Sequence, residues 1–238
     1  AIDISGNGNN GSMQNGALFA VDKVGQGFKF DGVDDHVSVP DSPSLRPTNL
    51  TIEGWFNWTS FSGPGQNVLV AKTVGSGGLD SFALFYEPGQ QRLVAVTSTA
   101  SNYNEYLLMG FTPVLGTWYH VTYTYDDGAN VQAMYVNGSG ISGSVSSSIA
   151  YDSHPVTIGA GIENEVLHQP FHGKADEVSI YSRALSQTEI QSIVNAGLAG
   201  KLKSANTNTD PDRPAGGSRR SAAQMSPNAV STTVGDVT

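Results

Sequence analysis

The chain of 238 residues contains no cysteine, and only 14% of its residues are charged. Without cysteine it has no disulfide, no thiolate zinc site and no cysteine nucleophile. No apolar run approaches the ~20 residues that span a bilayer, so we expect no direct membrane insertion. The scarcity of charge and the 28 glycines indicate many turns between short strands rather than long helices.

The charges that are present are mostly acidic. Asp and Glu number 21 against 12 Lys and Arg, which gives a formal net charge of −9 at pH 7. Five of the basic residues lie after position 200, so the body of the chain is more acidic than the chain as a whole. An acidic body repels phosphate backbones, and we therefore expect no nucleic-acid partner. Calcium or neutral sugars suit this charge better.

Alternation of apolar and polar residues predicts many short strands. In residues 50–56, for example, Leu50, Ile52 and Phe56 share one face of an extended chain, with Glu53 on the other. Turn signals such as Asn137-Gly138 separate several of these runs, as in an antiparallel sandwich. Further strands are predicted at residues 67–72, 82–86, 93–98, 106–111, 118–125, 131–136, 145–149, 156–158 and 177–180.

One short helix is predicted near the end of this body. Ser186 and Glu189 have the spacing of a capping box, in which each side chain bonds to the other residue's backbone N–H. Ile190 and Ile193 then supply an apolar face, and Gly197 stands where a helix commonly ends. A helix this short needs the sandwich beneath it for stability.

The composition divides the chain into three parts. Residues 1–200 hold the predicted strands and helix, and we expect them to form one domain. Residues 201–229 have the composition of a flexible linker, and residues 230–238 alternate again, as at the start of a further domain. The chain begins at Ala1 without a signal-peptide pattern, and we expect a segment of a longer protein whose other domains are its neighbours.

Five segments, in order, resemble the laminin-G-like jelly rolls of the concanavalin A-like lectin/glucanase superfamily. They are DISGNGNNG (3–11), VGQGFKFDGVDDHV (24–37), LTIEGWF (50–56), GTWYHV (116–121) and GKADEVSIYSRALS (173–186). The resemblance implies an all-β, two-sheet antiparallel jelly-roll sandwich with one short C-terminal helix, the class that the residue patterns also predict. Family members usually have a further strand before the first segment. Its absence here predicts an unpaired sheet edge that the tail is not expected to fill.

The resemblance also implies a role. Members are mostly non-catalytic recognition modules of secreted or cell-surface proteins, which bind glycans or protein partners, often with calcium. We therefore expect an extracellular module for carbohydrate binding or adhesion, with a glycan or a cell-surface protein as its partner. A ligand-free structural spacer is the first alternative, and a glycoside hydrolase is the second.

Calcium is the predicted cofactor, in a structural role. The loop after Asp3 offers a carboxylate, amides such as Asn7 and freely bent glycines, which suit a hard cation that takes six to eight oxygens. By resemblance, Asp176 of the closing strand approaches this loop, with Asp31 nearby. The alternative is that these residues only form Asx turns and cap strand ends.

Aromatic side chains beside amides and acids are the signature of a sugar site. The glycan-binding candidates are Asn102, Tyr103 and Asn104, followed by Trp58, with Glu163 and His168 in a third cluster. The alternative is that the aromatic residues fill the core, as expected for Trp55 and Trp118.

No pattern of catalysis is present. The seven glutamates lack the Glu-x-Asp-x-x-Glu spacing of some hydrolases in this superfamily. There is also no Gly-x-Ser-x-Gly elbow and no His-Glu-x-x-His pattern. We therefore predict that this chain is not an enzyme.

Overall fold

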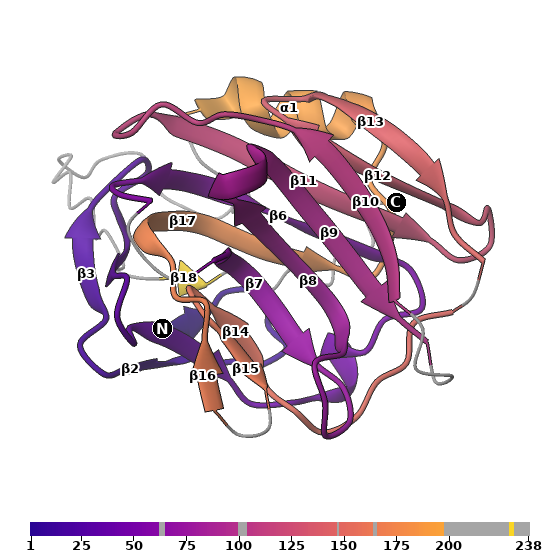
Figure 1. Cartoon of the computed structure of the whole chain (residues 1–238), viewed down its shortest axis with the longest axis horizontal. Helices are drawn as coiled ribbons and strands as arrows, with labels where there is room; N and C mark the ends of the chain where they lie inside the picture. Colours follow the sequence, from indigo (N-terminus) through magenta and orange to yellow (C-terminus); the bar gives the residue numbers. More distant parts are fainter. Residues whose placement is uncertain (62–64, 100–103, 147, 164–165, 198–228, 231–238) are drawn as a thin grey trace, which may run out of the picture.

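Two seven-stranded antiparallel sheets pack face to face in the computed structural model, which describes residues 1–61, 65–99, 104–146, 148–163, 166–197 and 229–230 (Figure 1). The front sheet contains, in spatial order, β10 (Asn104–Gly110), β9 (Arg92–Ser98), β8 (Asp80–Glu87), β7 (Asn67–Thr73), β14 (Val156–Ile158), β5 (His36–Val39) and β2 (Ser12–Gln14). The back sheet contains β13 (Ser139–Ser144), β12 (Val131–Val136), β11 (Trp118–Asp126), β6 (Leu50–Trp58), β17 (His172–Tyr181), β4 (Gln26–Asp31) and β3 (Leu18–Val21). The predicted two-sheet jelly roll with one helix is confirmed.

Smaller elements complete the described part of the chain. Two short hairpin strands, β15 (Gly161–Glu163) and β16 (Val166–His168), pair with each other and pack beside β7. The 3₁₀ turns are η1 (Pro43–Leu45) and η2 (Pro88–Gln90). Helix α1 (Gln187–Ala196) begins at the predicted capping box of Ser186 and Glu189 and ends at Gly197. Within the described residues, no helix is long and apolar enough to cross a membrane.

The core lies between the two sheets and is rich in aromatic residues. Trp58 is fully buried, with ring centroids 5.6 Å from Phe171, 5.7 Å from Tyr86 and 5.8 Å from Phe111. Strand β6 runs on to Trp58 and turns this side chain inward, because alternate residues of a strand face the same side. The prediction that Trp58 binds a glycan is therefore wrong, since no ligand reaches it.

The Asn137-Gly138 turn sets the position of the edge strand β13. Both residues have positive φ, 51° and 78°, as a two-residue hairpin turn requires. The chain therefore reverses at once, and Ser139 pairs with Val136. The strand predicted at residues 145–149 is wrong for this reason, and Val145 instead packs into the core.

The last described strand pairs with the first strand of the chain. Strand β18 (Ala229–Val230) pairs in parallel with β1 (Ile2–Asp3) in a two-stranded sheet (Figure 1). This strand begins one residue before the predicted boundary at 230. It pairs with β1 outside both seven-stranded sheets and so fills the edge of neither, and the division of the chain into three parts stays a prediction. The predicted linker and residues 231–238 lie outside the described residues apart from β18.

Candidate functional site

The outer face of the front sheet carries two apolar rows that cross four neighbouring strands. Val68 of β7 pairs with Phe85 of β8, which pairs with Val94 of β9 and, beyond it, Leu108 of β10. The next row runs through Ala71, Ala83, Val96 and Tyr106 in the same way. Residues opposite one another in a sheet share a face, so both rows form one surface.

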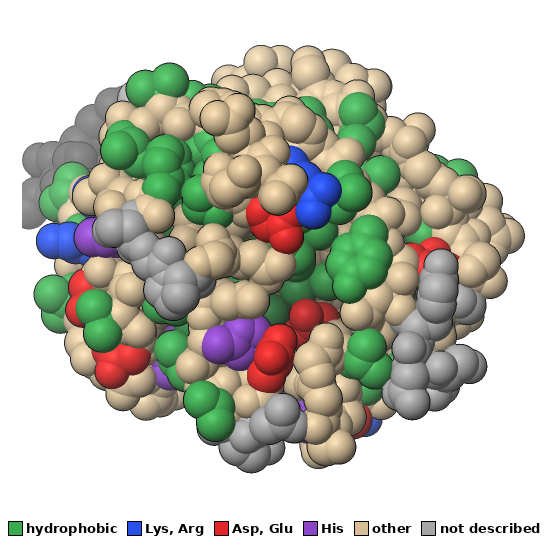
Figure 2. Space-filling model, viewed as in Figure 1, with side chains coloured by type: hydrophobic (Ala, Val, Ile, Leu, Met, Phe, Trp, Pro, Cys, Tyr) green, Lys and Arg blue, Asp and Glu red, His purple; other side chains and the backbone are tan. Residues whose placement is uncertain are grey.

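This surface is the floor of a groove of about 530 Å³. Six of its apolar side chains are at most 6% exposed and form a cluster separate from the main core: Val68, Ala71, Ala83, Phe85, Val94 and Val96. Figure 2 shows a hollow near the middle of this face, with hydrophobic side chains between acidic, basic and histidine side chains. An apolar depression with a few polar groups at its margin is the usual form of a small-ligand site.

One end of the groove is acidic. Asp80 of β8 and Glu163 of β15 both line it, and His168 of β16 lies 3.4 Å from the Glu163 carboxylate. Burial, together with the Glu163 charge, raises the pKa of Asp80 to about 7, although a hydrogen bond with Thr73 opposes the shift. Two carboxylates with one histidine leave this end short of positive charge.

The opposite end is electrically balanced. The Arg92 guanidinium of β9 pairs with the Glu87 carboxylate of β8, its direct neighbour across the sheet. The Gln66 amide also donates to Glu87, at 2.9 Å. These planar polar groups offer donors and acceptors to a ligand that lies on the apolar floor.

Strand β10 forms the side wall of the groove. Tyr106 is 53% exposed and Leu108 is 46% exposed, although both continue the buried rows of the floor. The Asn104 amide donates to the Tyr106 hydroxyl at 3.0 Å. An exposed tyrosine beside an amide is the pattern predicted for sugar binding.

The predicted glycan-binding residues therefore fall in different places. Asn104 lines the groove, as do Glu163 and His168 of the third cluster. Asn102 and Tyr103 lie outside the described residues. Sequence reasoning missed Asp80 as a site residue. The alternation of Tyr106 and Leu108 along β10 could have indicated an outward-facing row, because Tyr106 pairs with Val96 and Leu108 with Val94.

The predicted calcium residues of the N-terminal loop bond within that loop. The Asp3 carboxylate accepts from the Ser5 backbone and hydroxyl, both at 2.8 Å, and from the Asn9 backbone at 2.9 Å. Asn7 is exposed and donates to the Ser5 hydroxyl at 3.0 Å. These contacts match the alternative expectation of Asx turns.

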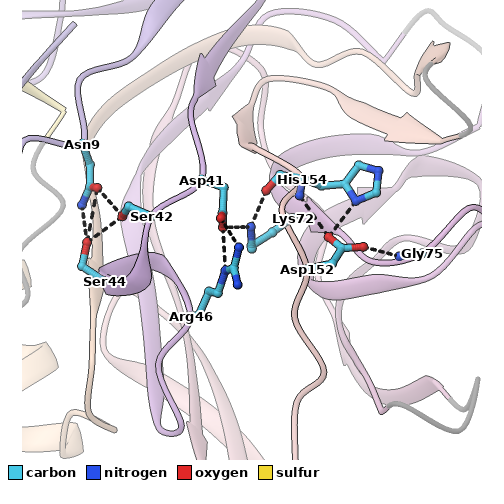
Figure 3. A network of polar contacts seen from close by, with 9 residues as sticks. All are labelled: Asn9, Asp41, Ser42, Ser44, Arg46, Lys72, Gly75, Asp152 and His154. Atoms are coloured by element: carbon cyan, nitrogen blue, oxygen red, sulfur yellow. Dashed lines mark hydrogen bonds and ion pairs between the residues drawn. The ribbon is translucent and has the colours of Figure 1, made fainter.

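Figure 3 shows two groups of polar contacts, one between this loop and η1 and one at the rim of the front sheet. In the first, the Asn9 amide donates to the hydroxyl of Ser44 in η1 at 2.9 Å. In the same view, the fully buried Lys72 of β7 donates to the Asp41 carboxylate at 2.7 Å and to the His154 carbonyl, and Arg46 also pairs with Asp41. Arg46 and Lys72 together hold the pKa of Asp41 down to about 2, against a smaller opposing effect of burial.

The structure separates Asp31 from Asp176. Strand β4 pairs with β17 so that His172 lies opposite Asp31 and Ala175 lies opposite Phe28. Asp31 and Asp176 therefore stand at opposite ends of β4, ~10 Å or more apart by the rise of a strand. Asp31 instead joins Asp34 and Asp35, whose ligand oxygens lie within 4.8 Å of one another. Asp3, Asn7, Asp31 and Asp176 thus do not form one site.

Asp176 lies beside a carboxylate that the sequence did not point to, that of Asp22. The Asp22 side chain is fully buried; its Oδ1 accepts from Lys174 at 2.6 Å, and its Oδ2 has no hydrogen-bond partner among the described residues. The Asp176 carboxylate accepts from the Val24 backbone at 2.6 Å, in a bulge of β17. Burial, helped by nearby Glu177 and Asp22, raises the pKa of Asp176 to about 6.

Gly27 lies against these two carboxylates and the backbone of β17. A Cβ placed on Gly27 would lie 2.8 Å from Asp22 Oδ2 and 2.7 Å from the Ala175 carbonyl oxygen. An unpartnered carboxylate oxygen and a carbonyl oxygen therefore converge next to the buried Asp176. This donor set is the kind that a hard cation binds.

Comparisons with known proteins identify the fold. Residues 31–191 match a family profile described as the concanavalin A-like lectin/glucanases superfamily. No curated protein matches the chain. Among solved structures, the receptor-binding domain of a botulinum neurotoxin C/D mosaic superposes with a TM-score of 0.65 at 13% identity, covering 82% of this chain and 48% of that one.

Two further structures show the same likeness. The binding domain of Paraclostridial Mosquitocidal Protein 1 has a TM-score of 0.62 at 18% identity, with 82% of this chain and 49% of that chain covered. The binding domain of botulinum neurotoxin DC, solved in complex with SialylT, has a TM-score of 0.63 at 14% identity and covers 82% and 48%. The chain thus spans about half the length of these solved chains, and at such identities the likeness concerns the fold.

Proposed function

The chain belongs to the concanavalin A-like lectin/glucanase superfamily, and on this premise we propose that it is a non-catalytic carbohydrate-binding module whose binding site is the groove on the outer face of the front sheet. The observation that carries the proposal is the buried apolar floor across β7, β8 and β9, bordered by the exposed Tyr106 of β10 and by carboxylate and amide groups. Apolar sugar faces rest on such a floor while hydroxyls bond to the polar margin.

The structural neighbours and the charge of the chain support a glycan as the partner and an extracellular location. One protein of the same fold was solved with SialylT bound, which is a precedent for glycan binding. The acidic chain repels nucleic acid, and the described residues contain no membrane-spanning helix. We place the module in a secreted or cell-surface protein, with a glycan or a cell-surface protein as partner.

A glycan array with groove variants tests the binding site. Tyr106→Ala should weaken binding of any captured oligosaccharide about tenfold, because the ring supplies contact area at the wall of the groove. Tyr135→Ala is the matched control on β12 of the back sheet, and it should leave binding unchanged. Equal losses in both variants would contradict the assignment of the groove. An array without any captured glycan would favour the ligand-free spacer.

The same samples test the absence of catalysis. Asp80 and Glu163 are the carboxylates that a glycoside hydrolase would need in this groove. We expect bound oligosaccharides to remain intact during long incubation. Cleavage by the unmodified chain that disappears in Asp80→Asn would show instead that the chain is a hydrolase.

We also propose that a structural calcium ion binds beside Asp22 and Asp176. The unpartnered Asp22 oxygen, the buried Asp176 carboxylate and the Ala175 carbonyl fit a hard cation better than the four residues predicted from sequence. The ion would neutralise two buried carboxylates, of which Asp22 is also paired with Lys174. It would thereby fix the bulge of β17 against the loop before β4.

Thermal unfolding with calcium or with chelator tests this site. The midpoint should rise with calcium concentration, because a ligand that binds only the native state stabilises it. Asp176→Asn should abolish the rise, whereas Asp31→Asn, in the exposed acidic group, should preserve it. A midpoint unaffected by calcium would refute the site, as would a rise that is lost only in Asp31→Asn.

A further inference from the structure

We propose that the groove on the front sheet selects sugars that carry a protonated amine, with the ammonium group placed between Asp80 and Glu163. The inference rests on the proposed function, because it assumes that the groove binds carbohydrate. It adds the chemical class of the sugar and names the residues that choose it.

The charges of the groove are unequal along its length. Its described lining contains three carboxylates, those of Asp80, Glu87 and Glu163, and one guanidinium, that of Arg92. Arg92 is already paired with Glu87. The other two carboxylates, those of Asp80 and Glu163, lie together at the opposite end, with His168 beside Glu163.

Among the residues that the structure describes, no lysine or arginine lines the acidic end of the groove. Asp80 is half-buried and hydrogen-bonds with Thr73, a neutral group, while Glu163 has the partly exposed His168 at 3.4 Å. Burial raises the pKa of Asp80 to about 7, and repulsion from the neighbouring Glu163 carboxylate adds to the shift, so the charged form of Asp80 is poorly stabilised. An ammonium ion brings both the charge and three N–H donors.

A negatively charged sugar is disfavoured by the same two carboxylates. A carboxylate-bearing sugar would place a third anion beside Asp80 and Glu163, and like charges in a partly dry groove cost affinity.

The apolar floor fixes where the rest of the sugar lies. The floor ends at Ala71 and Ala83, small residues that leave space above them, and both line the groove together with Asp80. A pyranose ring resting on these small residues presents its substituents to the groove margin. An amino group on that ring can then reach the acidic end while the following sugars extend toward Tyr106.

Calorimetric titration with two matched oligosaccharides tests the inference. The probes are the tetramer of β-1,4-linked glucosamine and the tetramer of β-1,4-linked N-acetylglucosamine, which have the same rings and differ in the free amine. Near pH 7 and at low salt, the glucosamine tetramer should bind about tenfold tighter or more. Added salt should reduce this advantage, because screening weakens the attraction between ammonium and carboxylate.

Variants locate the source of the preference. Asp80→Asn and Glu163→Gln should each remove most of the advantage of the amine, measured as the ratio of the affinities for the two tetramers. Asp34→Asn removes an exposed carboxylate outside the groove and should keep the advantage. Melting curves check that each variant is folded, which is expected because an amide replaces a carboxylate of the same shape.

The outcomes separate this inference from the function on which it rests. Equal or tighter binding of the N-acetylated tetramer would overturn the preference for amines while the groove remained a sugar site. A preference that survives both Asp80→Asn and Glu163→Gln would also overturn it. If the array and both titrations detect no oligosaccharide, the proposed carbohydrate-binding function fails as well.

Discussion

Lys72 is a fully buried cation of the front sheet, and its burial depends on Asp41. The Lys72 ammonium donates to the Asp41 carboxylate and to the His154 carbonyl, and Arg46 holds the same carboxylate from the exposed side (Figure 3). A buried charge that loses its partner is strongly destabilising. Asp41 therefore stabilises the fold by more than a surface ion pair would.

We expect Asp41→Asn to lower the free energy of unfolding at pH 7 by about 2–3 kcal/mol, as measured by urea denaturation. The pKa of Asp41 is about 2 in the folded chain and about 4 in the unfolded chain. The contribution of the Asp41 carboxylate to the free energy of unfolding is therefore complete above pH 4 and is lost as the pH falls toward 2. The difference between the two proteins should shrink by about half at pH 3.

Asp34→Asn is the control for this measurement. Because Asp34 is exposed, this substitution should change the free energy of unfolding by no more than about 0.5 kcal/mol. A difference between Asp41→Asn and the unmodified chain that stays constant from pH 7 to pH 3 would contradict the ion-pair explanation. Packing or backbone geometry would then be the source of the loss.

At the scale of elements, most strands could be predicted from the sequence, but the groove that they form could not. Strands such as β6 and β11 alternate clearly, and the turn Asn137-Gly138 and the capping box of Ser186 have local signatures. The hairpin of β15 and β16 has three-residue strands whose position depends on packing against β7, a contact distant in sequence. It supplies Glu163 and His168 to the groove, which is why the acidic end could not be assembled from the sequence.

The floor of the groove could not be predicted from the sequence for a related reason. Ala83, Val94 and Val96 are as apolar as core residues, and in a sequence they are indistinguishable from the inward-facing positions beside them. Strands that are apolar on both faces indicate burial on both sides. Here the second face lies under a groove instead. Trp58 shows the reverse error, because this aromatic residue, two positions after the predicted strand at 50–56, was assigned to a glycan site and belongs to the core.

At the scale of the whole molecule, the two sheets divide structural and binding roles. The inner faces hold the main core, the outer face of the front sheet forms the groove, and helix α1 lies at the edge near β13 (Figure 1). The proposed calcium site, beside β4 and β17 of the back sheet, is separate from the groove. Stability with calcium and affinity for glycans should therefore respond to different substitutions.

The central claim is that glycans bind in the groove, and nuclear magnetic resonance of the isotope-labelled chain tests it most directly. Titration with the glucosamine tetramer should shift backbone signals of β7, β8, β9 and β10 and of the hairpin formed by β15 and β16. Signals of β12 and β13 in the back sheet should stay in place. Shifts confined to the back sheet or to the loop around Asp3 would contradict the account.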